Sequence, residues 1–436
     1  MYLLSDSQSG LQAALNITAH HALRYHQRFN PSKTNAVVVG SKIDMAYFKD
    51  ISPWTLYGKK LNVVETNEHL GLLVSGLNEE QKNVDNNITK CRNSLFAMLG
   101  PALAYKCLLN PVVQTHIWRT CHLPILLSGL PALPIRSVHV KSLSTFHKRI
   151  MRGFLKLSKY SPVPALYFLL GELPVEGVLH CRTLGLLHNV ASNPNTTVYA
   201  MIKYILMMCE EKSTTWSNHV TELCMRYDLP PPLALLESPP SKESWKELVK
   251  TKVTIWHERN LRDMSLNNSK MCYLNVQLLG LSGQPHPALV SIHNTQDIRK
   301  LRLHLKFLCG DFMTNDRLTR FQPGSNPACS LCGGPVESYE HVLLMCRATS
   351  EIRERLRPDL LNAIYDAFPN CRLLQYNPPP SLMLQFLLDC TSPNLPNDVR
   401  IAAHNPYVFQ IFRIARDWCY GISNARCRLS QTNVDN

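Results

Sequence analysis

The sequence predicts a mainly α-helical protein with a small α+β unit at its N-terminus and a Cys-Cys-His-Cys knuckle near its C-terminus. Apolar residues recur at helical spacing in most segments after residue 78, which is the pattern of amphipathic helices. Short apolar runs before residue 78 are typical of buried strands. Three cysteines and one histidine gather in segment 329–346, which favours a small metal-stabilised unit.

The composition indicates a folded protein with an anionic partner. With 436 residues the chain can form roughly two to four domains. Its hydrophobic content of 45% is ordinary for a globular protein. Its formal net charge of +14 and pI of about 9.1 are not ordinary. Such a charge favours a polyanion, of which nucleic acid is the commonest and an anionic membrane surface the second.

The cysteines and the absence of targeting signals bear on the compartment. The 15 cysteines are odd in number, and most stand alone in apolar runs, as Cys107, Cys121 and Cys309 do. That usage is typical of a reducing compartment. Segment 1–7 does not resemble a secretory signal, and no long apolar run is free of charges and prolines. We expect an intracellular protein, in the nucleus or cytoplasm, that is not secreted and has neither a membrane partner nor a small-molecule substrate.

The predicted elements begin with an amphipathic helix over 9–24, which Ser9 would cap and Asn30-Pro31 would stop. Short strands are expected at 36–40, 61–64 and 70–74, with a pairing that the sequence leaves open. Helices are predicted over 79–108, 112–128, 139–159, 178–191, 196–211 and 241–265, with closing helices over 348–367 and 406–423. Prolines 230–232 and 239–240 predict a linker over 229–240.

The knuckle has the residue types and spacing of a structural zinc site. Cys329 and Cys332 would offer two thiolates from one tight turn, and Gly333-Gly334 lets the backbone bend behind them. His341 and Cys346 follow at a distance that the start of a helix can bring to the same ion. A catalytic zinc is disfavoured because protein residues fill all four positions and leave none for water.

A long basic stretch provides the candidate nucleic-acid surface. No Asp or Glu occurs between Asn86 and Gly171. At 100° per residue, Leu143, Phe146, Ile150, Phe154 and Leu157 form an apolar seam. The opposite side carries a stripe of Lys141, Lys148, Arg152, Lys156 and Lys159. Together with Arg149, these are the predicted nucleic-acid-binding residues. An outward row of cations can follow a phosphate backbone. A plain solvated face and a membrane-surface helix are the alternatives.

Several short motifs follow one another along the chain. They are Leu3-Leu4-Ser5-Asp6-Ser7-x-Ser9-Gly10-Leu11-Gln12, Asn30-Pro31-Ser32-Lys33-Thr34, His69-Leu70-Gly71-Leu72, Leu170-Gly171-Glu172-Leu173-Pro174 and Glu337-Ser338-x-Glu340-His341-Val342-Leu343. In this order they resemble the reverse transcriptases of non-LTR (LINE-type) retrotransposons from the end of the palm to the C-terminal zinc-binding domain. The resemblance is specific at both ends and loose between 200 and 290.

The resemblance implies roles for several residues and a division of the chain. Asn30, Lys33 and Thr34 would belong to a palm motif, with Lys33 near the incoming nucleotide, and Leu70-Gly71 would lie near the primer terminus. The knuckle would contact RNA or target DNA. The implied units are a partial palm (1–77), a basic helical thumb-like region (78–228), the linker (229–240), a helical connector (241–295), a zinc-binding domain (296–350) and C-terminal helices (351–436).

The catalytic carboxylates of that family have no counterpart in this sequence. The family polymerises with two metal ions held by clustered aspartates. This chain begins just after the place of the aspartate pair, and Asp6, Asp44 and Asp50 are isolated. We therefore expect a truncated RNA- or DNA-binding fragment that is not an enzyme as it stands. The alternative is a zinc-stabilised helical protein-interaction module without a nucleic-acid role.

Overall fold

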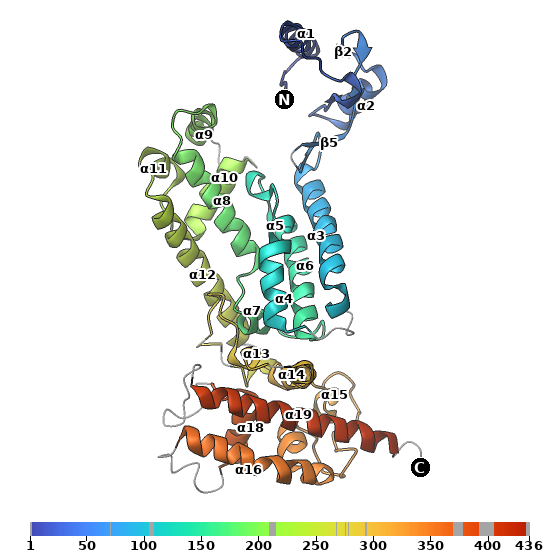
Figure 1. The fold of residues 1–436 in the computed structure, drawn as a ribbon, viewed down its shortest axis with the longest axis vertical. Helices are drawn as coiled ribbons and strands as arrows, with labels where there is room; N and C mark the ends of the chain where they lie inside the picture. Colours follow the sequence, from blue (N-terminus) through green and yellow to red (C-terminus); the bar gives the residue numbers. More distant parts are fainter. Residues whose placement is uncertain are drawn as a thin grey trace.

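The computed structural model shows an elongated, mainly helical molecule (Figure 1). An N-terminal unit lies at one end, long helices occupy the middle, and a C-terminal helical unit lies at the other end. The structure describes residues 2–69, 71–103, 109–208, 215–266, 268–274, 276–277, 279–292, 294–368, 378–391 and 405–432. The predicted mainly α class is confirmed.

The N-terminal unit combines two helices with very short strands. Its elements are α1 (Gln8–Arg24), β1 (Asn35–Ala36), α2 (Lys42–Ile51), β2 (Thr55–Leu56), β3 (Lys59–Lys60), β4 (Asn62–Val63), β5 (Thr66–His69) and β6 (Leu72–Ser75), with a 3-10 turn at Pro31–Lys33. The strands form three separate pairs, of which β1–β4 is parallel and β2–β3 and β5–β6 are antiparallel. Each pair presents few backbone groups to its partner, so side-chain packing carries much of this unit's stability.

Two predictions for this unit need correction. The strand expected at 36–40 is too long, because β4 offers β1 a partner for two residues only. The helix expected at 9–24 is present, but Ser7 rather than Ser9 caps it, with its hydroxyl accepting from the Gly10 amide at 3.2 Å. The small core of this unit, beneath α1, includes the buried side chains of Leu15, Trp54 and Leu61. The unit therefore folds around its own core.

The middle of the molecule is built from packed helices. They are α3 (Glu79–Leu103), α4 (Pro111–Ile117), α5 (Leu123–Leu126), α6 (Ser137–Leu155), α7 (Val163–Leu170) and α8 (Val175–Ala191), with a π turn at Trp118–His122 and a 3-10 turn at Leu130–Ala132. Pro124, which has no N–H to donate, lies just after the π turn and near the start of α5. Helix α6 lies at the centre of this group and packs against α3, α4 and α8.

A second group of helices packs on α8. It contains α9 (Thr197–Met208), α10 (Trp216–Arg226), α11 (Pro232–Glu237) and α12 (Lys242–Leu266). The segment 229–240, predicted as a linker, holds α11, whose Leu235 and Leu236 are buried in a core shared with α8 and α12. The prolines thus turn the chain inside a packed group and do not space two units apart.

The C-terminal unit closes the fold. Its elements are a 3-10 turn (Ser269–Met271), α13 (Pro287–Val290), α14 (Thr295–Leu308), α15 (Asn315–Thr319), a π turn (His341–Met345), a 3-10 turn (Arg347–Thr349), α16 (Ser350–Ala367), α18 (Pro380–Leu388) and α19 (Pro406–Thr432). One hydrophobic core includes Leu95 of α3, Phe154 of α6, Leu305 of α14 and Trp418 of α19. The predicted divisions at 295 and 350 therefore fall within one continuous core.

The sequence predicts no membrane-spanning segment, and the length and apolar character of the helices bear on this prediction. Among the described helices, none combines the length and the apolar character needed to cross a membrane. Even α7, whose residues are almost all buried, has only 8 residues. A span of the bilayer core takes about 20 residues.

Candidate metal centre and basic surface

The first half of the centre is a tight turn that carries Cys329 and Cys332. The Gly333 amide donates to the Cys329 carbonyl at 2.9 Å, and the Cys329 amide donates to the Gly334 carbonyl at 2.8 Å. Gly333 has φ +71°, a left-handed conformation that favours glycine. A Cβ on Gly334 would lie 2.8 Å from Cε1 of His341. The glycine pair therefore shapes the turn and leaves room for the imidazole.

The second half is a single π turn that carries His341 and Cys346. The His341 amide donates to the Ser338 hydroxyl at 3.1 Å, which starts the turn. The Cys346 amide donates to the His341 carbonyl at 2.7 Å, which ends it. The wide turn brings the side chains of residues 341 and 346 to the same side, where the first turn presents its thiols.

The four predicted ligands form one cluster in the structure. Their ligand atoms all lie within 4.8 Å of one another. Sγ of Cys329 is 3.9 Å from Sγ of Cys346, and Sγ of Cys332 is 3.3 Å from Nε2 of His341. Cys329 and Cys346 are buried, whereas the other two are half-buried. The prediction that these residues lie together is confirmed, and the cluster could hold a metal ion.

Burial works against a thiolate at Cys329 unless a cation compensates for it. Burial raises the pKa of the Cys329 thiol to about 12, although the backbone amides of Leu331 and Cys332 oppose the shift. Burial also lowers the pKa of His341, which favours the neutral imidazole that metals bind. A bound cation would offset the cost of the thiolate charge.

Three contacts hold the cluster in place, two of them long-range, and sequence reasoning missed their partners. Arg426 of α19 pairs with Glu337, whose carboxylate is fully buried. Arg353 of α16 donates to the Cys346 carbonyl. The Trp418 indole of α19 donates to the carbonyl of Leu343 at 2.9 Å. Glu337 lay in a recognised motif, but nothing in the sequence marked partners so far along the chain.

The apolar seam of α6 is confirmed. Leu143, Phe146, Ile150 and Phe154 are all buried in the main core. The helix ends at Leu155, earlier than expected, because Lys156 adopts a left-handed conformation with φ 54°. The predicted helix over 139–159 is therefore too long at its C-terminal end. This early end changes where the last cations point.

The predicted cation row is divided by the structure. Lys141, Arg149 and Lys159 are exposed, and Lys148 and Arg152 are half-buried. The Arg152 guanidinium donates to the Ser161 carbonyl at 3.2 Å, so it also closes the loop after α6. The expected outward position of Lys156 is wrong, because its side chain is only 7% exposed. Burial lowers the pKa of Lys156 to about 8, with nearby Arg302 acting in the same direction.

The palm-motif residues lie in short local structures. The Asn30 side chain accepts from the Ser32 amide at 2.9 Å, and the Thr34 hydroxyl donates to the Asn30 carbonyl at 2.9 Å. Lys33 is exposed. Gly71 occupies the turn between β5 and β6 with φ +85°, and Leu70 lies outside the described residues. These contacts account for the local shape of the motifs.

The motif at 170–174 has a packing role. Gly171 ends α7 with φ +64°, and a Cβ there would lie 2.2 Å from the Gln284 carbonyl oxygen. Glu172 is buried and pairs with Arg119, whose Nε donates to its carboxylate at 3.0 Å. Burial raises the pKa of Glu172, and the Arg119 guanidinium opposes that shift. The motif thus joins α7 to the segment around 284.

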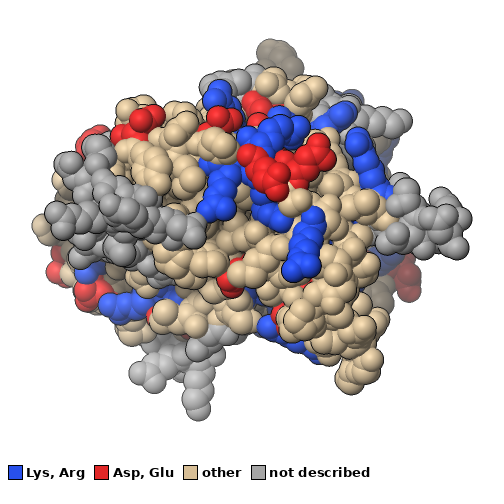
Figure 2. Space-filling view, turned by 90° about the horizontal axis from the view of Figure 1, so that it is seen from below, with Lys and Arg blue, Asp and Glu red and all other residues tan. Residues whose placement is uncertain are grey.

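The end of the molecule formed by the C-terminal unit carries charges of both signs. Figure 2 shows Lys and Arg side chains beside Asp and Glu on this face, with uncharged surface between them. Helix α16 alone contributes Glu351, Glu354, Arg355, Arg357 and Asp359. No large surface of a single sign is visible in this view on the residues that the structure describes.

No protein-family model matches the chain, and no curated protein matches it.

Proposed function

We propose that this chain is a nucleic-acid-binding fragment of a non-LTR-type reverse transcriptase, and that it binds RNA or DNA without polymerising nucleotides. The observation that carries the proposal is a Cys3His cluster in a chain of net charge +14 with a long acid-free basic stretch. Small Cys/His units are common in proteins that bind single strands. The order of the motifs along the chain agrees with the proposal.

The metal in the cluster is proposed to be a structural zinc ion. Three thiolates and one imidazole suit the tetrahedral coordination that zinc prefers. All four positions are supplied by protein, so no position is left for a reacting water. Next to the cluster, Arg353 donates to the Cys346 carbonyl and Arg426 pairs with Glu337. Both contacts stabilise the fold around the cluster, which agrees with a structural role for the metal.

The exposed cations of α6 are the proposed contacts with phosphate. Lys141 and Arg149 are exposed, and in the described part of the chain neither has an ion pair or a hydrogen bond from its charged group. Free, solvated cations can neutralise phosphates and release counterions, which drives binding at low salt. Lys148 and Arg152 are half-buried, so they would add to the positive electrostatic potential near α6 more than they would contact phosphates directly.

The proposed lack of polymerase activity follows from the missing carboxylates. Asp44 is used to cap α2, where its side chain accepts from the Ser41 amide at 3.1 Å. Two-metal chemistry needs several carboxylates that converge on both ions. Primer extension by the purified chain in magnesium would contradict the proposal.

Gel-shift titration across salt tests the proposed binding. We expect affinity for single strands to fall steeply with salt, with a log–log slope of about −0.7 per neutralised phosphate. The double variant Lys141→Gln/Arg149→Gln should weaken binding and flatten that slope. Lys59→Gln/Lys60→Gln removes the same charge from the exposed strand β3 and is the matched control. Equal binding by both variants would exclude α6 as the contact.

A protein-interaction module is the second candidate, and the surface of α9 favours it. Val198, Met201, Tyr204, Met207 and Met208 are all more than half exposed. An exposed apolar helix face is typical of a protein-binding surface. Binding that stays constant from low to moderate salt, or no binding to nucleic acid, would favour this candidate.

A further inference from the structure

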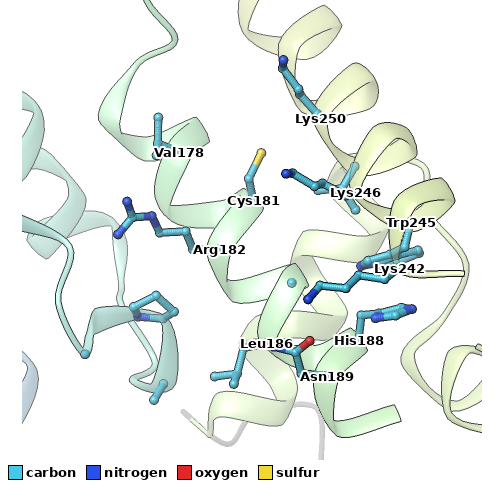
Figure 3. A pocket seen from close by; sticks show the side chains of 15 residues that line it. Val178, Cys181, Arg182, Leu186, His188, Asn189, Lys242, Trp245, Lys246 and Lys250 are labelled. Carbon is cyan, nitrogen blue, oxygen red and sulfur yellow. The ribbon is translucent and has the colours of Figure 1, made fainter. Parts of the chain in front are cut away.

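A cavity of about 620 Å³ lies between α8, α12 and the turn at 129–132. Figure 3 shows α8 crossing the site, with Val178, Arg182, Leu186 and Asn189 along it. These residues recur at helical spacing, so one face of α8 forms the floor of the cavity. The volume lies in the range of about 300–1,000 Å³ that is usual for ligand sites.

The walls of the cavity carry positive charge only. Its lining includes Arg182, Lys242, Lys246 and Lys250, and it includes no Asp or Glu. Figure 3 shows Lys242 and Lys246 extending from α12 toward α8, with Arg182 on the opposite side of α8. Across the described ranges of the chain, none of these cations has an ion pair or a side-chain hydrogen bond.

Unpaired cations around one cavity repel one another. Arg182 is half-buried, and this burial lowers its pKa. The three lysines are exposed, so solvent screens part of this repulsion, and a bound anion would relieve the rest. The cavity is thus electrostatically complementary to an anionic ligand.

The spacing of the lysines and the character of the floor narrow the ligand class. Lys242, Lys246 and Lys250 follow one another every fourth residue, so they repeat about every 6 Å along α12. A regular row of cations matches a regular row of anions, such as the phosphates of an extended strand. The floor carries the apolar side chains of Val178 and Leu186 and is open at Gly185, where an added Cβ would meet nothing within 4 Å. Flat apolar faces, such as those of nucleobases, can lie there.

We propose that this cavity is a subsite for single-stranded nucleic acid, in which the lysines of α12 bind successive phosphates and the floor of α8 accepts bases. The inference rests on the proposed nucleic-acid-binding function and assigns part of it to a place outside the knuckle and outside α6. Arg182 would contact the strand from the other side of the floor. An acidic peptide is the competing ligand.

Fluorescence anisotropy with a labelled oligothymidylate tests the charge of the cavity. Lys246→Gln/Lys250→Gln should weaken binding roughly tenfold at low salt and make the log–log slope of the salt dependence shallower by about 1.4. The control Lys59→Gln/Lys60→Gln carries the same charge change on exposed β3 and should keep the wild-type slope. Equal affinities and slopes in the two variants would overturn the cavity as a site while leaving nucleic-acid binding intact.

A neutral variant tests the space above the floor. Gly185→Leu fills the open position without changing charge and should also weaken oligothymidylate binding several-fold, whereas Gly185→Ala should not. Unchanged binding by Gly185→Leu would exclude bases from the floor. The wild type should bind oligothymidylate in preference to polyglutamate. Binding of polyglutamate without oligothymidylate would overturn both this inference and the proposed function.

Discussion

Arg426 in α19 pairs with Glu337, a fully buried carboxylate between the two halves of the Cys/His cluster. The other carboxylate oxygen of Glu337 accepts the Asn315 amide at 2.8 Å. One carboxylate therefore joins the final helix, the start of α15 and the cluster. The metal centre belongs to the C-terminal core, and its shape depends on residues far along the chain.

Breaking this pair should destabilise the C-terminal unit. Glu337→Gln leaves the Arg426 guanidinium largely buried without a counter-charge. Loss of one partner of a buried pair costs about 3–5 kcal/mol, so the urea midpoint should fall clearly. Glu351→Gln, an exposed change at the start of α16, is the control and should stay within about 0.5 kcal/mol of wild type. Equal stability of both variants would mean that the pair does not hold the unit.

Removal of a cluster thiol should abolish metal binding and lower thermal stability. Cys329→Ser and Cys346→Ser each delete a buried ligand, whereas Cys272→Ser changes an exposed cysteine outside the cluster. Elemental analysis should find zinc in wild type and in Cys272→Ser only. A chelator should lower the thermal midpoint of those two proteins and leave the cluster variants unchanged, since metal binding supplies folding energy.

If wild type and Cys329→Ser retain the same metal content, the ion is held elsewhere. If a chelator removes the metal without any change in the thermal midpoint, the centre does not stabilise the fold. The two results separate metal binding from its structural consequence.

Local sequence patterns predicted the cluster and many helices. The four ligands lie in one short segment, so their spacing alone brought them together. The helix predicted at 241–265 is α12, and the closing helices predicted at 348–367 and 406–423 are α16 and α19. In these segments apolar residues recur at helical spacing over several turns, even across Pro358 inside α16.

Tertiary contacts determine the features that local sequence patterns could not predict. Lys156 falls on the polar side of an ideal helix, but α6 ends one residue before it and the turned chain carries it inward. The proline cluster at 230–232 is typical of a linker, but Leu235 packs into a core formed by helices distant in sequence. The pairs Arg426–Glu337 and Arg119–Glu172 join segments whose separation hides them from any local pattern.

Stability should fall as pH falls from about 6.5 to about 4, because buried histidines must stay neutral. Burial lowers the pKa of His147 to about 3 and that of His304 to about 4. Their ordinary value in an unfolded chain is about 6.5, so in this window the unfolded chain binds protons that the folded chain does not. The contribution of the neutral histidines to the free energy of unfolding is therefore fully present above about pH 6.5 and is lost as the pH falls through this window. Each histidine contributes at most about 1.4 kcal/mol per pH unit within it.

Urea denaturation from pH 4 to pH 7 measures this effect, and His147→Phe isolates one group. His147 stacks on Trp118 with ring centroids 5.3 Å apart, and phenylalanine keeps the stack without a titrating nitrogen. The variant should show a shallower loss of stability toward low pH. His20→Phe, at an exposed site on α1, is the control. A His147→Phe profile parallel to wild type would contradict the argument.

Gly171→Ala should destabilise the fold, whereas Gly185→Ala should not. Gly171 has φ +64°, and an added Cβ would lie 2.2 Å from the Gln284 carbonyl oxygen, which is held in place by neighbouring backbone hydrogen bonds. The left-handed conformation alone costs alanine about 1–2 kcal/mol, and the contact adds to that cost. Gly185 lies inside α8 with open space around it, so alanine should stabilise the helix by up to about 1 kcal/mol. Thermal denaturation of the two variants should therefore shift in opposite directions. A stable Gly171→Ala would show that the segment around 284 can move away and that the close approach at Gly171 is not needed for stability.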